Sequence, residues 1–296
     1  MSMRFTEIGQ QLRAYRLESG LRAEEIAARL GVSRAALYRY EKGEVIKLDT
    51  IKRLAELLKI SPLSLLGIGV EYYNRAIGYF ERIRQIEETA DQLLQLSGGL
   101  CYLTTSEAYD NALAEAFDEA AEQAGAERVA MRSISEQVLA ILSARKRMYT
   151  MRRPGIIAMI SLPTIQRLID GGIVTGLPLS DRVRRICRDV AISEVEHIAT
   201  LMETEPMGLQ FGVLAGWEPS SAFTILRARD RVSLAINPFR TGAHPSAQTG
   251  VAMITGADEA IAAHQRVAEA SWREAIKGPA GAARLRQLLS AASPVT

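Results

Sequence analysis

Residues 31–44 read GVSRAALYRYEKGE, and this stretch decides how the N-terminal part of the chain is interpreted. Gly31 can take the positive φ angle that a tight turn between helices needs. Ser33 can then cap the amide groups of a following helix. We therefore predict a helix that starts at Arg34 and ends at Gly43.

Helical spacing divides the side chains of this predicted helix between two faces. Leu37 and Tyr40 point inward, and the outward face carries Arg34, Ala35, Tyr38 and Arg39. An outward arginine can fork onto the two acceptors of guanine in a major groove, and a tyrosine can reach a base edge or a phosphate. Two arginines on a helix face are more typical of a solvated surface, so the face alone does not indicate DNA binding.

The preceding segment supplies the missing context. Residues 21–30 form a short amphipathic helix whose apolar face holds Leu21, Ile26, Ala27 and Leu30. The two helices are joined by a turn of three or four residues, which is typical of a helix-turn-helix unit.

Residues 4–67, with the run LRAYRLESGLRAEEIAARLGVSRAALYRYEKGE at 12–44, resemble the Cro/C1-type (XRE) helix-turn-helix family. The resemblance implies an all-α domain of five short helices and an ion pair between Arg16 and Glu41. Ala23 stands where the family usually places a phosphate-binding glutamine, with Arg22 as a possible substitute. Tyr40 replaces an aliphatic residue. The DNA-contacting positions expected on this basis are Arg22, Ser33, Arg34, Ala35, Tyr38, Arg39 and Lys42.

Length, composition and charge are consistent with a DNA-binding module joined to a larger domain. The 296 residues are 48% hydrophobic and 24% charged, as in soluble globular proteins. Residues 1–70 carry 12 Lys and Arg against 8 Asp and Glu, a net charge of +4, and the remainder carries a net charge of −2. One copy of so modestly basic a module would bind DNA weakly, so two copies on one DNA are expected. Without an apolar membrane span or a signal-like N-terminus, a cytoplasmic protein is expected.

Residues 71–96 favour one long helix, because they contain no proline and no glycine after Gly78. Apolar residues recur there at spacings of three and four, as in a coiled-coil seam: Tyr72, Ala76, Tyr79, Ile83, Ile86, Ala90 and Leu93. Such a helix could pair two copies of the chain and set the spacing of two half-sites. Packing on the chain's own C-terminal domain explains the pattern equally well.

From residue 98 onward the chain alternates between strand-like and helix-like segments, which predicts an α/β domain with a mainly parallel sheet. The predicted strands are 100–104, 128–132, 155–161, 208–215, 222–226, 232–236 and 250–254. The predicted helices are 107–124, 135–149, 164–170, 180–203, 257–276 and 282–291. The resulting division is a DNA-binding domain at 1–69, a linker or dimerisation helix at 70–97, and an effector or interaction domain at 98–296.

The element order of this region, with the segment GADEAIAAHQRVAEASWREAI, resembles a phospholipase-D-like fold that some transcription regulators use as a sensor. The catalytic signature of that family, a histidine followed two residues later by lysine, is absent after His197, His244 and His264. Phosphate-loop, dinucleotide, hydrolase-elbow and zinc-protease motifs are also absent. We expect no enzyme activity, no cofactor and no metal, and two buried reduced thiols at Cys101 and Cys187.

Two segments beside predicted strands could line an effector pocket. Arg152 and Arg153 precede the strand at 155–161, and Arg240 and His244 follow the strand at 232–236. Ligands in open α/β sheets bind beyond the carboxyl ends of strands, which favours Arg240 and His244 with Trp217 as a wall. A surface loop with solvated charges is the alternative.

These observations favour a dimeric transcription regulator that binds a palindromic operator in double-stranded DNA and whose C-terminal domain senses a small molecule or a partner. The alternative is a DNA-bound, antitoxin-like interaction protein without a small-molecule ligand. An enzyme that carries a DNA-binding module would need a cluster of titratable groups that the sequence does not show.

Overall fold

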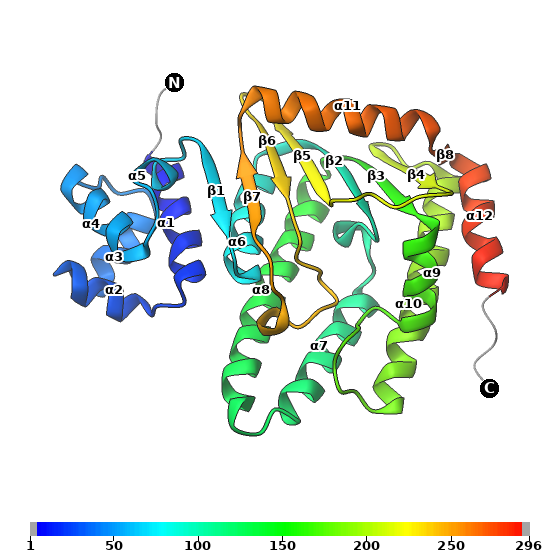
Figure 1. Cartoon of the computed structure of the whole chain (residues 1–296), viewed down its shortest axis with the longest axis horizontal. Helices are drawn as coiled ribbons and strands as arrows, with labels where there is room; N and C mark the ends of the chain where they lie inside the picture. The colour runs from blue at the N-terminus through cyan, green and yellow to red at the C-terminus, as the bar shows by residue number, and fades with distance from the viewer. Residues whose placement is uncertain (1–4, 292–296) are drawn as a thin grey trace.

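The computed structural model describes residues 5–291, and Figure 1 shows a small helical domain beside a larger α/β domain. The first four and last five residues of the predicted domains, including Arg4 at the start of the family resemblance, lie outside the described residues. The helical domain contains α1 (Phe5–Ser19), α2 (Ala23–Leu30), α3 (Arg34–Glu41), α4 (Leu48–Leu58) and α5 (Pro62–Leu65). The predicted five-helix domain is confirmed.

Local signals place the ends of these helices. Gly31 ends α2 in the left-handed conformation, with φ of 70°. Ser33 precedes α3, and its Oγ accepts a hydrogen bond from the amide of Ala36 at 3.1 Å. The core between the helices is made of fully buried side chains: Leu12, Ile26, Leu37, Leu54 and Leu65.

One eight-stranded sheet, with the order β1-β7-β6-β5-β2-β3-β4-β8, forms the centre of the α/β domain. Its strands are β1 (Val70–Tyr73), β2 (Ala90–Gly98), β3 (Gly155–Ser161), β4 (Leu209–Leu214), β5 (Phe223–Ala228), β6 (Val232–Ile236), β7 (Ala252–Thr255) and β8 (Ile276–Lys277). Among the described strands only β2–β3 and β3–β4 pair in parallel. The predicted α/β class is confirmed. The prediction of a mainly parallel sheet was wrong. The runs at 222–226 and 232–236, for example, are joined by a turn too short for a parallel crossover, so they pair antiparallel.

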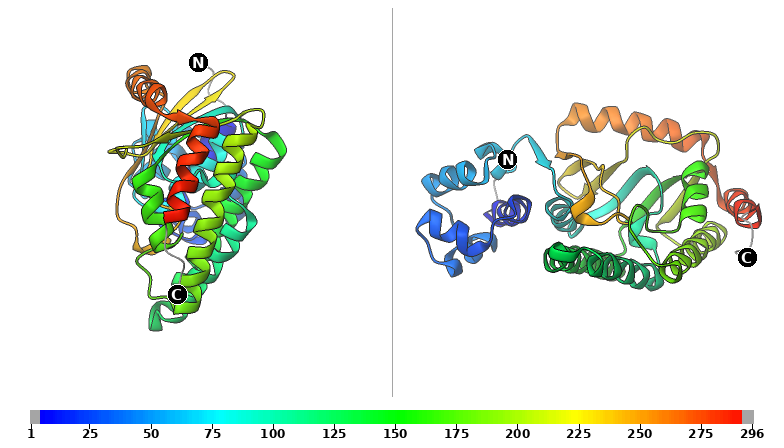
Figure 2. Two further views of the ribbon diagram at one scale, coloured as in Figure 1. Left: turned by 90° about the vertical axis from the view of Figure 1, so that its right-hand side faces the viewer. Right: turned by 60° about the horizontal axis from the view of Figure 1, so that its bottom comes forward.

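Helices cover both faces of the sheet unequally. Helix α11 (Asp258–Glu274) lies across one face, over a core of Leu96, Met159, Phe223, Ile225 and Leu234. The other face packs against the remaining helices (Figures 1 and 2). These are α6 (Ala76–Glu87), α7 (Glu107–Glu122), α8 (Arg128–Arg152), α9 (Leu162–Gly171), α10 (Asp181–Thr204) and α12 (Gly278–Ala291).

The long helix predicted over 71–96 is present only as α6, with β1 before it and β2 after it. Residues 70–97 are therefore part of the α/β domain and not a linker. Most residues of the predicted seam are buried inside the chain's own fold: Ala76, Tyr79, Ile83, Ile86, Ala90 and Leu93. The seam prediction was wrong because apolar periodicity reports that a face is covered, without identifying what covers it.

Two predicted strands are also helical. Residues 102–104 form a short 3-10 turn, and 128–132 are the first residues of α8. The run RVAMR continues into the predicted helix at 135–149 without a proline or glycine. Extending a helix costs far less than nucleating one, so the longer helix absorbs a segment whose local preference is ambiguous.

Helix α1 of the N-terminal domain packs along α6 of the α/β domain. Buried polar contacts join them: Glu71 accepts hydrogen bonds from Gln11 Nε2 at 2.9 Å and from Arg82 Nε at 2.8 Å. Glu18 on α1 accepts a bond from the amide of Asn74 at 2.7 Å, just before α6 begins. The two domains therefore share a hydrogen-bonded interface.

Candidate nucleic-acid interface

Helix α3 presents a polar outer face on an apolar base. Leu37 is fully buried beneath it, and Arg34, Ala35 and Arg39 are exposed. Tyr38 and Tyr40 are both half-buried, so the expected difference between an outward Tyr38 and an inward Tyr40 is smaller than the spacing suggests.

The two outer arginines are held by acidic neighbours. Arg34 Nη1 lies 2.7 Å from Glu24 Oε1, and its Nη2 donates a hydrogen bond to the Tyr38 hydroxyl at 3.1 Å. Arg39 Nε donates to Glu44 Oε2 at 2.7 Å. These pairs are solvent-exposed, and exposed pairs contribute about 0–1 kcal/mol. Both guanidinium groups can therefore exchange a carboxylate for a phosphate or a base at low cost.

The other expected DNA-contacting side chains surround the same face. The Arg34–Glu24 pair joins the first turns of α2 and α3, and Arg22 precedes α2. Arg22 is exposed, its amide donates to Glu25 Oε2 at 2.9 Å, and its guanidinium Nη2 donates to Glu25 Oε1 at 3.2 Å. Ser33 and Lys42 bracket α3 and are exposed. Arg22, at the start of α2, thus lies near the start of α3, and the other six expected residues lie on α3 or directly at its ends.

The Arg16–Glu41 pair fixes α3 against α1. Arg16 Nε donates to Glu41 Oε1 at 2.5 Å, and its Nη2 donates to Glu41 Oε2 at 3.1 Å. Burial opposes the charged form of Arg16, but the bond to Glu41 outweighs it and raises the pKa of the guanidinium. Glu41 is buried at the end of α3, so the pair orients the outer face from below.

Sequence reasoning missed the roles of Glu24 and Glu44. Each lies within ten residues of the arginine that it pairs with, and acidic residues at 24 and 44 are visible in the printed sequence. The Arg39–Glu44 pair could have been expected, because the two opposite charges are close in sequence. The Arg34–Glu24 pair could not, because Glu24 approaches Arg34 only where α2 and α3 cross.

The predicted effector residues do not converge on one site. Strand β6 runs in the same direction as β2 and β3, because β5 is antiparallel to both β2 and β6. Arg240 and His244 follow β6, and Trp217 follows β4, which is parallel to β3. These three residues therefore lie beyond the carboxyl ends of the parallel strands. Arg152 and Arg153 precede β3 and lie beyond the amino ends of these strands. One pocket cannot therefore be lined by the arginines before β3 and by the residues after β4 and β6.

His244 is unsuited to ligand binding, in contrast to the prediction. It is 1% exposed, and both ring nitrogens are engaged, with Ser135 Oγ and Ser246 Oγ each at 2.7 Å. Burial lowers the pKa of His244. Ser135 Oγ also donates to the Met131 carbonyl at 2.9 Å, so its proton is not directed to the imidazole as a nucleophile would require. The contact joins α8 to the loop after β6.

The remaining effector candidates are surface residues. Trp217 and Arg240 are exposed, and Arg240 offers its backbone amide to Gln248 Oε1 at 2.6 Å. Arg152 lies 3.5 Å from Asp91, and Arg153 ends α8 in the left-handed conformation with φ of 47°. Trp217, Arg153 and Arg240 match solvated surface residues better than a pocket wall, and Arg152, the last residue of α8, lines a cavity of only about 10 Å³.

Both cysteines are buried free thiols, as predicted, and burial raises the pKa of each to about 11. Within the described part of the chain, no helix is both long enough and apolar enough to cross a membrane.

Comparison with known proteins gives one family match. Residues 7–65 match a family model described as a helix-turn-helix domain, and no curated protein or solved structure matches the chain significantly. The matched segment covers α1 to α5, including the outer face of α3. By fold and by this match, residues 7–65 form a helix-turn-helix domain, which supports DNA binding.

Proposed function

We propose that the chain is a sequence-specific transcription regulator of the Cro/C1 (XRE) type, which binds a palindromic operator as a homodimer and whose α/β domain controls it. The observation that carries this proposal is the outer face of α3. Its exposed arginines are held by exchangeable surface ion pairs and, for Arg34, by a bond to the Tyr38 hydroxyl. The helix beneath them is fixed by the Arg16–Glu41 pair.

In this function α3 enters the major groove. Arg34 and Arg39 each present a fork of donors to guanine, and Tyr38 reaches a base edge or a phosphate. Ser33, Arg22 and Lys42 contact phosphates on either side, and the exposed Ala35 allows close approach to a thymine methyl group. The exposed cations Lys47, Lys52 and Arg53 on and before α4 add to the basic surface.

The dimer is proposed from the size of this reading surface. One eight-residue helix reaches only a few base pairs, and the +4 charge of residues 1–70 favours two copies on one operator. Apart from the exposed Tyr72, the residues of the rejected seam are buried within one chain, so the contact between copies must use another surface.

The α/β domain is proposed to regulate and not to catalyse. Its contacts with α1, a buried one through Glu71 and a more exposed one through Glu18, supply a physical route from that domain to the helix-turn-helix domain (α1 to α5), called the reader below. A phospholipase-D-like sensor fold would agree with this role, and we retain that resemblance as a proposal only.

Selection of bound sequences from random double-stranded DNA tests the function. The full chain is expected to enrich an inverted repeat, and light scattering of the complex is expected to give two chains per duplex. The doubly substituted Arg34→Ala/Arg39→Ala chain should lose the enrichment, and Arg273→Ala, on the exposed side of α11, should keep it. Enrichment of no motif, or of the same motif without both arginines, would refute the proposal.

A further inference from the structure

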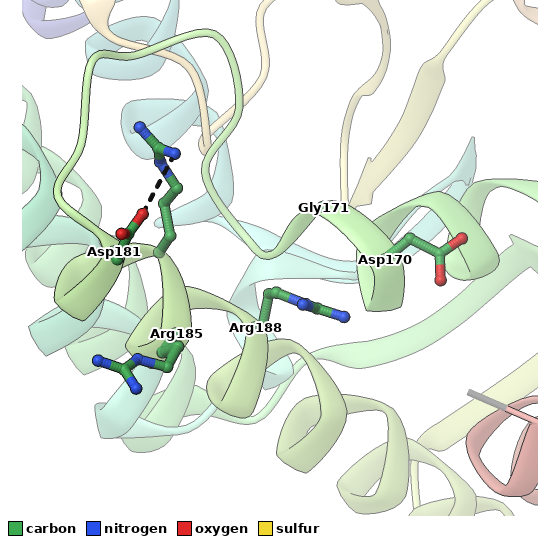
Figure 3. Close-up of a pocket in the computed structure, with 6 residues that line it drawn as sticks. Asp170, Gly171, Asp181, Arg185 and Arg188 are labelled. Carbon is green, nitrogen blue, oxygen red and sulfur yellow. Dashed lines mark ion pairs between the residues drawn. The ribbon is translucent and has the colours of Figure 1, made fainter. Parts of the chain in front are cut away.

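A charged cleft lies between the end of α9 and the first two turns of α10, on the side of the α/β domain away from the reader (Figures 1 and 3). Its volume is about 490 Å³. The lining residues are Asp170, Gly171, Asp181, Arg184, Arg185 and Arg188. None of the described residues at its wall is aromatic or a large aliphatic.

The arginines of this cleft are only partly compensated. Arg184 lies 3.5 Å from Asp181, but no described residue forms an ion pair with Arg185 or Arg188. The Nε of Arg188 is buried and lacks a hydrogen-bond partner among the described residues. A ligand in the cleft would meet the terminal guanidinium nitrogens of this half-buried side chain, to which the described part of the chain supplies no hydrogen-bond acceptor. A charge-assisted bond there would stabilise the bound ligand without breaking an existing ion pair.

The side chains of Arg188 and Arg185 point in different directions. In Figure 3 Arg188 reaches across the cleft toward Asp170 at the end of α9, and Arg185 points to the other side of α10. Arg185 is exposed, so a change of rotamer brings it to a ligand held by Arg188. Asp170 is held in place by Gln166, whose Nε2 donates to Asp170 Oδ1 at 3.0 Å.

We propose that this cleft binds a sugar phosphate. A phosphate monoester accepts paired hydrogen bonds from a guanidinium group, which suits Arg188 and Arg185. Asp170 and Asp181 would repel a bare anion but accept hydrogen bonds from sugar hydroxyl groups. The wall offers no surface on which a nucleobase could stack, and the volume falls within the usual range for small-molecule sites.

Contacts at the start of α10 connect the cleft to the neighbouring helix α7. Ser180 Oγ donates to Glu119 Oε2 at 2.9 Å, and Arg182 Nη1 pairs with Glu115 at 2.5 Å. Helix α7 packs on α8, α8 on α6, and α6 on α1 of the reader. The sugar phosphate thus acts as the effector of the proposed regulator, and this regulatory role, unlike the binding itself, rests on the proposed function.

Calorimetric titration of the full chain tests binding. The probes are glucose 6-phosphate, ribose 5-phosphate and glycerol 3-phosphate, with glucose and inorganic phosphate as the matched halves. At least one probe is expected to bind about tenfold or more tightly than either half. Arg188→Gln should weaken that binding by about tenfold or more, because a hydrogen bond to a charged group is lost. Arg185→Gln should weaken it less, and Arg273→Gln should leave it unchanged.

A thermal melt of each variant without ligand shows whether it is folded, and the exposed Arg185→Gln keeps the test valid if Arg188→Gln unfolds. Absence of binding by all three probes overturns the proposal. Equal binding of inorganic phosphate, or unchanged binding by both arginine variants, overturns it as well.

Operator affinity with and without the bound probe forms a separate measurement. A change in affinity for wild type that is absent in Arg188→Gln supports the effector role. Binding without such a change rejects the effector role and leaves the site intact. Failure to select any operator would reject the proposed function, while the calorimetric result would still decide the site.

Discussion

Arginine–glutamate pairs occur in two very different settings in this molecule, on the outer face of α3 and between β1 and α6. The Arg34–Glu24 side chains are 58% and 54% exposed, and the Arg82–Glu71 side chains are 4% and 9% exposed. The same chemistry therefore has opposite consequences. The exposed pair is cheap to open and leaves its arginine available to the proposed DNA ligand. The buried pair, within the α/β domain, is costly to break and holds Glu71 in place to accept the bond from Gln11 of the helical domain.

The environment of Glu71 explains why the buried pair is structural. Its two oxygens accept bonds from both Arg82 Nε and Nη2, from Gln11 across the domain interface, and from the Tyr73 hydroxyl at 2.7 Å. Tyr73 in turn stacks on Tyr15 of α1, with ring centroids 5.2 Å apart. Burial, with Glu71 close by, raises the pKa of both tyrosines, so neither is charged near neutral pH. The carboxylate is thus the acceptor at the centre of the interface.

The largest expected effect comes from breaking the buried pair. Arg82→Met leaves Glu71 charged and buried without its main partner, which should lower the free energy of unfolding by about 3–5 kcal/mol. Urea denaturation followed by circular dichroism measures this loss.

Arg39→Met makes the same chemical change in an exposed pair and should alter stability by only about 0.5 kcal/mol. Equal losses in the two variants would contradict the comparison. The double variant Arg82→Met/Glu71→Met should recover part of the loss, because it removes the uncompensated charge together with its partner.

The Arg16–Glu41 pair is intermediate in burial between the exposed pairs of α3 and the buried Arg82–Glu71 pair, because Arg16 keeps some exposure and Glu41 is buried. Glu41→Ala removes the acceptor of two charge-assisted bonds and should lower the stability of the helix-turn-helix domain by about 1–3 kcal/mol. Its melting temperature should fall while base preference is retained. Glu44→Ala, an exposed pair on the same domain, is the control and should melt with wild type. Relaxed base preference in a stable Glu41→Ala chain would show that Glu41 takes part in reading.

The sequence contains enough to predict the reader because its signals are local. Gly31, Ser33 and the spacing of Leu37 act within a few residues, and each is sufficient to place a turn, a cap or a buried face. The charged outer face of α3 follows directly from that placement. The partner of Arg34 does not, because Glu24 approaches it only through the crossing of two helices.

The sheet and the α6 region depend on information that no single segment carries. The apolar side chains of residues 76–93 are buried whether a second chain or the chain's own sheet covers them. His244 follows a strand end where ligands often bind, yet Ser135, more than a hundred residues away, occupies its ring nitrogen. The cleft at Arg185 and Arg188 could have been suspected from the run DRVRRICR, but its depth depends on how α9 meets α10.

The arginines of α3 should behave oppositely to Arg82. Arg34→Ala or Arg39→Ala is expected to cost about 1–3 kcal/mol of specific DNA binding, through loss of a paired contact with guanine, and to leave the melting temperature unchanged. Fluorescence anisotropy with the selected operator and with a scrambled duplex separates specific from general affinity. An equal loss on both duplexes would identify the side chain as a phosphate contact.

The smallest effect is expected for Glu44→Gln, which changes only the carboxylate of the exposed Arg39–Glu44 pair. It therefore measures directly how strongly an exposed pair holds its arginine. Glu44→Gln removes a negative charge near the DNA and releases Arg39 from a pair worth about 0–1 kcal/mol, so operator affinity should rise by up to about fivefold. The gain should shrink as salt is raised, since screening weakens the pair in the wild-type chain as well. Glu56→Gln, on the exposed side of α4, controls for the change in net charge alone. If both variants gained equally, the Arg39–Glu44 pair would have no role in holding the reader, and the effect would belong to the overall charge of the domain.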